Sequence, residues 1–259
     1  MPKVLKDLFD LTDRVALVTG GSGGLGSEVA LAFSDYGARV TIAARQREPL
    51  ERTATQIAEK TGNEVHFVQC DVTQEGQVQG MVSEVVGRHG RIDILANFSG
   101  ANIRKPADEY PLADWESMFR ANVTSVFLCC REVGKQMIKQ KGGKIINVSS
   151  IRSEFAVAKH GLAYCATKAA VNMITRQLAC EWAPYKVLVN AIAPPIVETP
   201  LTKEFFKDQK FADTVRGRIP LGRWGYPEDI TGCALFLASN ASNFMTGEIV
   251  FVDGGMTIW

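Results

Sequence analysis

The sequence predicts an α/β protein with a doubly wound sheet of seven parallel strands. Short apolar segments rich in β-branched residues alternate with amphipathic segments of helical spacing along the 259 residues, which is typical of strands joined by crossover helices. Several of the apolar segments have apolar side chains at nearly every position, as expected for parallel strands covered on both faces. The first of them runs directly into a glycine-rich turn, at the sheet edge where such folds bind ligands.

Seven apolar segments are the predicted strands of this sheet. In chain order they are RVALVT (14–19), RVTIAA (39–44), EVHFVQC (64–70), IDILAN (92–97), KIINVS (144–149), KVLVNAIA (186–193) and EIVFVD (248–253). Between the first two, segment 24–36 places Leu25, Val29 and Phe33 on one helical face. No Pro/Gly/Ser-rich linker, charge block or repeat divides the chain, so we expect residues 1–259 to form a single domain.

Charge and composition favour a small-molecule substrate. The chain has 29 basic and 28 acidic residues, mixed along its length, and a net charge of +1, so no surface for nucleic acid or an anionic membrane is expected. Residues 1–13 lack an apolar signal region, and no apolar stretch is long enough to span a bilayer, which predicts a cytoplasmic protein. The six cysteines have no Cys-x-x-Cys or nearby His spacing, so no metal site is expected.

The first predicted strand ends in the turn TGGSGGLG (19–26). Glycines here permit a tight turn and let backbone amides and a helix N-terminus approach a pyrophosphate. Two patterns fit the turn: G-x-G-x-x-G on Gly21, Gly23 and Gly26, and T-G-x-x-x-G-x-G on Gly20, Gly24 and Gly26. Because a strand precedes the turn and a helix follows it, we predict a dinucleotide site on a Rossmann fold.

The second predicted strand is followed by Arg45 and not by an acid. A carboxylate here would bind the adenosine ribose of NAD, whereas a guanidinium suits the 2′-phosphate of NADP, so NADP is predicted over NAD. A solvated arginine at a helix start is the alternative reading. Asp71, directly after the third strand, is placed to accept a hydrogen bond from an adenine amino group, although an Asp there is also a common turn former.

The stretch AYCATKAAV carries Tyr164 and Lys168, and Ser149 and Ser150 precede it at the end of the fifth predicted strand. Residues four apart lie on one face of a helix, so the phenol and the ammonium can converge on one point. A Tyr-x-x-x-Lys pair with an upstream serine therefore predicts an acid–base site.

These motifs together resemble the short-chain dehydrogenase/reductase family. The resemblance rests on TGGSGGLG, Asp71-Val72, the ANFSG stretch (96–100), Asn122, Ser150, Tyr164-x-x-x-Lys168 and the IAPPIVET stretch, which follow the family's order and spacing. It covers essentially the whole chain. Within the family, the segments KDLFDLTDRVALVTG, SIRSE, RIPLGRWGYPEDI and FVDGGM are most similar to gluconate 5-dehydrogenases and 2-deoxy-D-gluconate 3-dehydrogenases.

The resemblance implies an NADP(H)-dependent oxidoreductase that interconverts a secondary alcohol and a ketone. Tyr164 would transfer the proton, and Ser150 would bind the substrate oxygen. Lys168 would hold the nicotinamide ribose and, together with the positive nicotinamide, lower the phenol pKa from its ordinary value of about 10. Asn122 would fix a water that links Lys168 to solvent; without the family pattern it reads as an ordinary polar residue inside a helix.

The cofactor contacts that follow from the motifs and the resemblance form one set. They are Gly20, Ser22, Gly23, Gly24, Leu25, Gly26, Arg45, Asp71, Val72, Asn97, Ser99, Gly100, Tyr164, Lys168, Val197 and Thr199.

Three positions depart from the family pattern. Phe98 replaces an amide, which removes one member of the family's backbone-bracing network. Pro195 follows Pro194 where the family usually has glycine, and it removes a backbone donor. This weakens the inference, drawn from the resemblance, that Val197 and Thr199 contact the nicotinamide. Ser150 lies 14 residues before Tyr164 where 13 is commoner, so Ser149 is the alternative for its role.

The substrate pocket is expected among the loops after the fourth and fifth strands and a lid near 196–226. Arg104 and Arg152 fall close to the expected reaction centre, where a guanidinium would bind the carboxylate of a sugar acid such as gluconate or 5-ketogluconate, or contact a related polyol. Solvated surface arginines are the alternative. A 3-oxoacyl thioester reductase and a catalytically silent dinucleotide-binding sensor are the competing functions, and retention of the whole Ser-Tyr-Lys-Asn set argues against the sensor.

Stretch 115–130 is apolar around more of the helix than one sheet face would cover. Its apolar residues are Trp115, Met118, Phe119, Val123, Val126, Phe127 and Leu128. A partner helix is the natural cover, and the resemblance implies a homotetramer. Deep burial within one subunit is the alternative.

Overall fold

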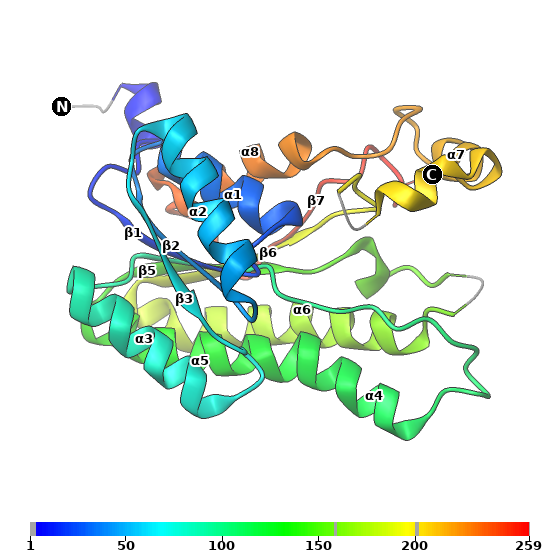
Figure 1. Cartoon of the computed structure of the whole chain (residues 1–259), viewed down its shortest axis with the longest axis horizontal. Helices are drawn as coiled ribbons and strands as arrows, with labels where there is room; N and C mark the ends of the chain where they lie inside the picture. Colours follow the sequence, from blue (N-terminus) through cyan, green and yellow to red (C-terminus); the bar gives the residue numbers. More distant parts are fainter. Residues whose placement is uncertain (1–3, 158–159, 200–201, 259) are drawn as a thin grey trace.

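Seven parallel strands form one sheet in the computed structural model, which describes residues 4–157, 160–199 and 202–258 (Figure 1). The strands are β1 (Val15–Thr19), β2 (Arg39–Ala44), β3 (Val65–Gln69), β4 (Ile94–Asn97), β5 (Gly143–Val148), β6 (Val187–Ala193) and β7 (Ile249–Phe251). They lie in the order β3-β2-β1-β4-β5-β6-β7. The predicted doubly wound parallel sheet is confirmed, because each strand lies within the expected segment or one residue beyond it.

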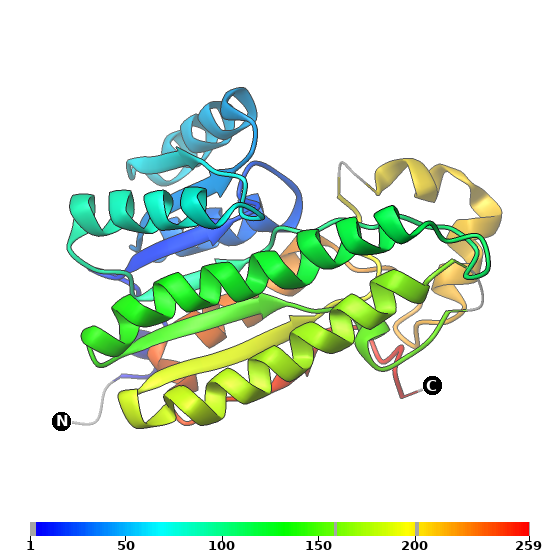
Figure 2. The same cartoon turned by 90° about the horizontal axis from the view of Figure 1, so that it is seen from below.

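Helices cover both faces of this sheet. The α-helices are α1 (Gly24–Asp35), α2 (Arg47–Thr61), α3 (Glu75–His89), α4 (Leu112–Phe119), α5 (Ser125–Lys139), α6 (Leu162–Trp182), α7 (Gln209–Arg216) and α8 (Pro227–Ala238). One apolar core lies between the sheet and α1, α2 and α8, and a second lies between the sheet and α3, α5 and α6 (Figure 1). Figure 2 shows α5 and α6 running side by side along their face. Among the described helices, none is long and apolar enough to cross a membrane.

The strand order reverses at β1. Strand β2 pairs with one edge of β1 and β4 with the other, and the helices that follow β1 and β4 pack on opposite faces of the sheet. The loops that leave the carboxyl ends of β1 and β4 start side by side and then turn toward opposite faces of the sheet. This separation opens a crevice at this edge. The sheet topology thus places the glycine-rich turn and the loop after β4 next to each other.

Buried amide side chains connect β4, β5 and α6 below this edge. Asn97 donates to Asn147 over 2.9 Å, and Asn147 donates to the hydroxyl of Thr175 over 3.0 Å. All three side chains are buried, so each bond is made away from water, where an unpaired polar group would be costly. Phe98 packs its ring against the core beneath α1. This network therefore persists beside the residue that replaces the family amide.

The stretch 115–130 differs from the single regular helix that we expected. A π-helical segment, Arg120–Thr124, separates α4 from α5. Met118, Val126 and Leu128 are buried within the subunit, as the alternative reading held. The rest of the apolar set forms a stripe that is partly or largely exposed: Trp115, Phe119, Val123 and Phe127.

Candidate active site

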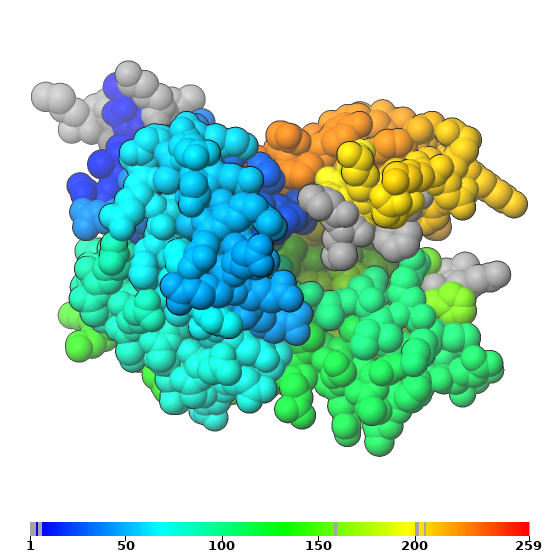
Figure 3. Space-filling view, in the orientation of Figure 1, coloured from blue at the N-terminus to red at the C-terminus, as the bar shows by residue number. Residues whose placement is uncertain are grey.

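A hollow opens at the carboxyl edge of the sheet. The space-filling view shows it between the segment that follows β6 and the loop that precedes α4 (Figure 3). The ends of β1, β4, β5 and β6 all lead to this edge because the strands are parallel. Residues from five separate chain segments meet here, and they include most of the predicted site.

Ser150 and Tyr164 face each other in this region. The hydroxyl of Ser150 lies close enough to the Tyr164 phenol to lower its pKa. It accepts a hydrogen bond from the Arg152 amide at 3.2 Å and donates to the Pro194 carbonyl at 3.5 Å. Ser149 instead donates to the buried side chain of Asn172 at 2.5 Å. The geometry therefore supports Ser150, and not Ser149, as the hydroxyl beside the phenol.

Lys168 lies below the phenol on α6. Its ammonium is 5.6 Å from the centre of the Tyr164 ring and donates to the Val148 carbonyl at 2.8 Å. The side chain is buried, and burial lowers the pKa of Lys168 to about 8. Lys168 therefore stays protonated at neutral pH but is close to losing its proton.

The pKa of Tyr164 moves in the direction opposite to our expectation. Burial raises the pKa of the phenol above 10, and the hydrogen bond from Ser150 offsets only part of this rise. Removing water destabilises the phenolate. The protein groups by themselves therefore keep the phenol protonated, and the expected fall in pKa would need the positive charge of an oxidised nicotinamide as well.

Asn122 projects inward from the π-helical segment. Its side-chain oxygen accepts from the Ala101 amide at 2.7 Å, and its amide donates to the Ala101 carbonyl at 2.9 Å and to the Thr167 hydroxyl at 3.1 Å. The extra residue in a π-turn breaks the regular helical phase at this point. Asn122 thus ties the loop after β4 to α6, and the water that we expected it to hold stays a prediction.

The glycine-rich turn packs closely on one side and is open on the other. A Cβ at Gly20 would lie 2.7 Å from the Phe98 backbone, and one at Gly26 would lie 2.3 Å from the Gly20 carbonyl oxygen. A Cβ at Gly23 or Gly24 would meet nothing within 4 Å. Helix α1 starts here without a side-chain cap, so its first amides are available to an anion. The turn therefore fits the pyrophosphate of a dinucleotide.

The remaining predicted cofactor contacts lie around the same crevice. Val72, Asn97 and Ser99 line one small cavity with Thr19. One carboxylate oxygen of Asp71 accepts from the amide and hydroxyl of Thr73, so Asp71 forms the turn. Its contact with an adenine amino group stays a prediction.

Described residues on both sides of positions 200–201 form backbone contacts beyond Pro195, despite the missing donor. Val197 pairs with Gly225 in a parallel bridge. The Thr199 amide donates to the Thr202 hydroxyl at 2.8 Å. The indole of Trp224, within the same 196–226 segment, donates to Glu198 at 2.8 Å. The two ends of the segment are thus joined to each other at the edge of the hollow.

Arg45 is exposed at the carboxyl end of β2, as predicted. In the described part of the chain its guanidinium has no ion pair or hydrogen bond. The neighbouring Arg47 is different, because it pairs with Glu51 at 2.7 Å and lies 5.5 Å from the centre of the Phe67 ring. Arg45 is therefore the free cation at this strand end.

Arg152 is the better placed of the two arginines predicted near the substrate. It is partly buried, and burial is the main cause that lowers its pKa; the charges of Arg218 and Arg104 lower it further, whereas Cys165 and Tyr164 raise it. Arg104 and Arg218 are exposed. The sequence placed the 196–226 segment at the substrate pocket but did not single out Arg218 among its residues.

Comparisons with known proteins give a consistent result. The family model described as Enoyl-(Acyl carrier protein) reductase matches residues 20–257. The NAD-dependent glycerol dehydrogenase of Listeria innocua is 40% identical over 96% of each chain, and the gluconate 5-dehydrogenase of Gluconobacter oxydans is 38% identical over 97% of this chain and 98% of its own. The crystal structure of a gluconate 5-dehydrogenase from Burkholderia cenocepacia in complex with NADP and tartrate has a TM-score of 0.93 at 37% identity, and covers 98% of each chain.

The lowered pKa of Lys168 predicts a pH-dependent contribution to stability. The folded-state pKa is about 8 against an ordinary 10.5, so between these values the unfolded chain binds more protons than the folded one. The free energy of unfolding of the wild type should therefore rise, relative to Lys168→Met, as the pH increases from about 8 to 10.5. Urea titrations of both proteins across this range measure the difference. A difference that does not change with pH would contradict the assigned pKa.

Proposed function

Since the chain belongs to the short-chain dehydrogenase/reductase family and is an NAD(P)-dependent alcohol dehydrogenase or reductase, we propose that it interconverts a secondary alcohol and a ketone on a sugar acid or related polyol, with NADP(H) as the preferred hydride carrier. The observation that carries the proposal is the placement of the Ser150 hydroxyl next to the Tyr164 phenol, with the Lys168 ammonium 5.6 Å from the centre of the Tyr164 ring. This group lies at the same sheet edge as a glycine-rich turn that fits a dinucleotide.

The proposed roles follow from the chemistry of each side chain. Ser150 donates to the reacting oxygen of the substrate and holds it against the Tyr164 hydroxyl. In the direction of reduction, Tyr164 gives its proton to the carbonyl oxygen; the raised pKa of the phenol keeps this proton in place at neutral pH. In the direction of oxidation, Tyr164 must first lose its proton, and the Lys168 ammonium stabilises the phenolate that results. The bound nicotinamide supplies the hydride chemistry.

The arginines at the mouth of the site favour an acidic substrate. Burial is the main cause of the lowered pKa of Arg152, and the charges of Arg218 and Arg104 lower it further. A carboxylate bound beside Arg152 would offset this repulsion. The similar Gluconobacter protein is named for gluconate, and the similar Burkholderia structure holds tartrate. The arginines separate the sugar acid only weakly from a 3-oxoacyl thioester, because the phosphate-bearing carrier of a thioester is anionic too. The substrate panel described below distinguishes the two.

The preference for NADP rests on this chain's own residues. The similar Listeria enzyme is NAD-dependent, whereas the similar Burkholderia structure contains NADP, so relatives at comparable identity use either cofactor. In this chain β2 is followed by the unpaired cation of Arg45 and not by a carboxylate. A free guanidinium at this position favours the 2′-phosphate.

We further propose a homotetramer with one domain per subunit and a substrate lid at 196–226. The exposed stripe on α4 and α5 (Trp115, Phe119, Val123 and Phe127), together with Leu162 and Met173 on α6, leaves an apolar face that a second copy would cover. The bridge between Val197 and Gly225 gives the lid one anchored base. Light scattering of the purified chain tests the assembly.

Replacing the proposed proton-transfer group tests the activity. Tyr164→Phe removes only the hydroxyl, so turnover should fall by about 10²–10⁴-fold while dinucleotide binding persists. Turnover is followed by nicotinamide absorbance with a panel of sugar acids, polyols and oxoacyl thioesters and with each cofactor. A loss below about tenfold would defeat the assignment, and turnover of thioesters alone would move the function to the competing reductase.

Removal of each arginine should separate substrate binding from surface charge. Arg152→Ala should raise the Michaelis constant for a sugar acid and spare a neutral polyol of similar length, because only the charged substrate loses its partner. Arg104→Ala should have the same selectivity with a smaller effect, since that side chain is more exposed. Equal damage to both substrates would assign these residues a structural role.

Cofactor choice should depend on Arg45. Arg45→Ala is expected to weaken NADPH binding by about 1.5–3 kcal/mol, the value of a charged hydrogen bond, with little effect on NADH. Titrations of both cofactors into the purified chain measure this. Equal losses for the two would refute the proposed contact with the 2′-phosphate.

A further inference from the structure

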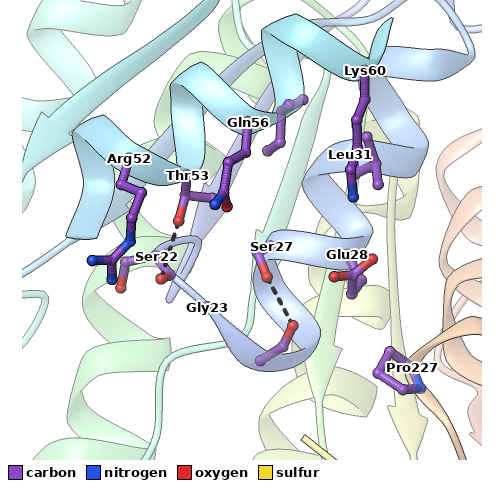
Figure 4. Close-up of a pocket in the computed structure, with 12 residues that line it drawn as sticks. Ser22, Gly23, Ser27, Glu28, Leu31, Arg52, Thr53, Gln56, Lys60 and Pro227 are labelled. Atoms are coloured by element: carbon purple, nitrogen blue, oxygen red, sulfur yellow. Dashed lines mark hydrogen bonds between the residues drawn. The ribbon is translucent and has the colours of Figure 1, made fainter. Parts of the chain in front are cut away.

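A pocket of about 270 Å³ lies between α1 and α2, next to the glycine-rich turn (Figure 4). Its lining includes Ser22 and Gly23 from the turn and Arg52 and Lys60 from α2. Figure 4 shows Arg52 and Ser22 at one end of the pocket and Lys60 and Pro227 at the other. The end with Arg52 is the one that adjoins the turn.

The position of Arg52 relative to the turn is held by a hydrogen bond. The hydroxyl of Thr53, the next residue on α2, donates to the Ser22 carbonyl at 3.2 Å. Thr53 is buried, so solvent does not compete strongly for this bond. Helix α2 is therefore attached to the turn at the point where Arg52 leaves it, and the guanidinium is kept near the Ser22 side chain.

The same end of the pocket adjoins the carboxyl end of β2. The amides of Gly20 and Gly21 both donate to the Ala43 carbonyl, at 2.8 and 3.3 Å. An adenosine ribose bound across this junction would direct its 2′ oxygen toward the residues that follow β2. Its 2′-phosphate would then lie between Arg45 on one side and Ser22 on the other.

The charge of Arg52 is not neutralised by a partner in the described part of the chain, and there is open space beside the neighbouring turn. Among the described residues its guanidinium has no ion pair or hydrogen bond. On the turn side, Gly23 leaves open space, since a Cβ there would meet nothing within 4 Å. A free cation facing an open turn is a binding arrangement for a phosphate.

We propose that Arg52 is a second specificity-determining residue for the cofactor, and that its guanidinium binds the 2′-phosphate of NADP together with the Ser22 hydroxyl and Arg45. Arg52 approaches the phosphate from the α2 side, across the space that Gly23 leaves open. This inference rests on the proposed use of NADP. It adds a residue that lies within a helix, away from the strand end where cofactor choice is usually read.

Binding to the purified full-length chain tests the proposal without relying on turnover. Arg52→Gln keeps a polar side chain that can still form hydrogen bonds but removes the charge, and should weaken NADP⁺ binding by about 10- to 100-fold, as expected for a lost charged hydrogen bond. NAD⁺ binding should not change. Calorimetric titration with NADP⁺, NAD⁺ and 2′,5′-ADP measures all three, and 2′,5′-ADP should lose as much as NADP⁺.

Arg47→Gln is the matched control, since Arg47 lies on the same helix but is paired with Glu51. It should bind all three ligands as the wild type does. If Arg52→Gln binds NADP⁺ like the wild type, or weakens NADP⁺ and NAD⁺ equally, the inference is wrong. If Arg52→Gln fails in either of these ways while Arg45→Ala selectively weakens NADP⁺ binding, the proposed NADP preference stands without Arg52. A wild type that binds NAD⁺ more tightly than NADP⁺ would overturn both cofactor proposals and leave the alcohol–ketone reaction to be judged by the Tyr164→Phe assay.

Discussion

The close approach of the glycine-rich turn to the loop after β4 is the constraint on which the rest of the site depends. Gly20 sits so near the Phe98 and Ser99 backbone that no side chain fits between them. Two residues on, Gly100 lies against Asn122, and Asn122 in turn binds the Thr167 hydroxyl, which donates to the Tyr164 carbonyl at 2.8 Å. A continuous chain of contacts thus runs from the dinucleotide turn to the helix that carries the phenol. Close backbone packing at Gly20 and the hydrogen bonds of two buried side chains, Asn122 and Thr167, together set the spacing between the two halves of the site.

Burial gives the two titrating groups opposite tendencies. It lowers the pKa of Lys168 to about 8 and raises that of Tyr164, so each group moves toward its neutral form when water is excluded. An ammonium next to a neutral phenol is therefore the resting state of the protein at neutral pH. The positive charge of an oxidised nicotinamide, when bound, would favour ionisation of the phenol, and this would couple the acid–base chemistry to the redox state of the cofactor.

Much of the fold was predictable because its signals are local. Uniformly apolar strands and the strand–turn–helix context of the glycines depend on neighbouring residues only, and both led to the observed sheet. The choice between Ser149 and Ser150 was not predictable, since adjacent residues differ only in which partner the folded chain gives them. Arg218 and Arg52 were missed for a related reason. Each of these arginines is brought near the site by segments that are distant in sequence. Nothing in the neighbouring residues distinguishes such an arginine from an ordinary one on a surface helix or loop.

The π-helical segment between α4 and α5 also determines how this chain tolerates changes in its length. Successive residues of an α-helix are about 100° apart around its axis, so deleting one residue from Arg120–Thr124 would turn everything on one side of the gap by that angle. Asn122 inside the subunit and Phe127 on its surface could not then both keep their present directions relative to α4. A point substitution in this segment removes the contacts of one side chain. A deletion or insertion of one residue would also rotate the buried site residues on one side of it relative to the surface residues on the other.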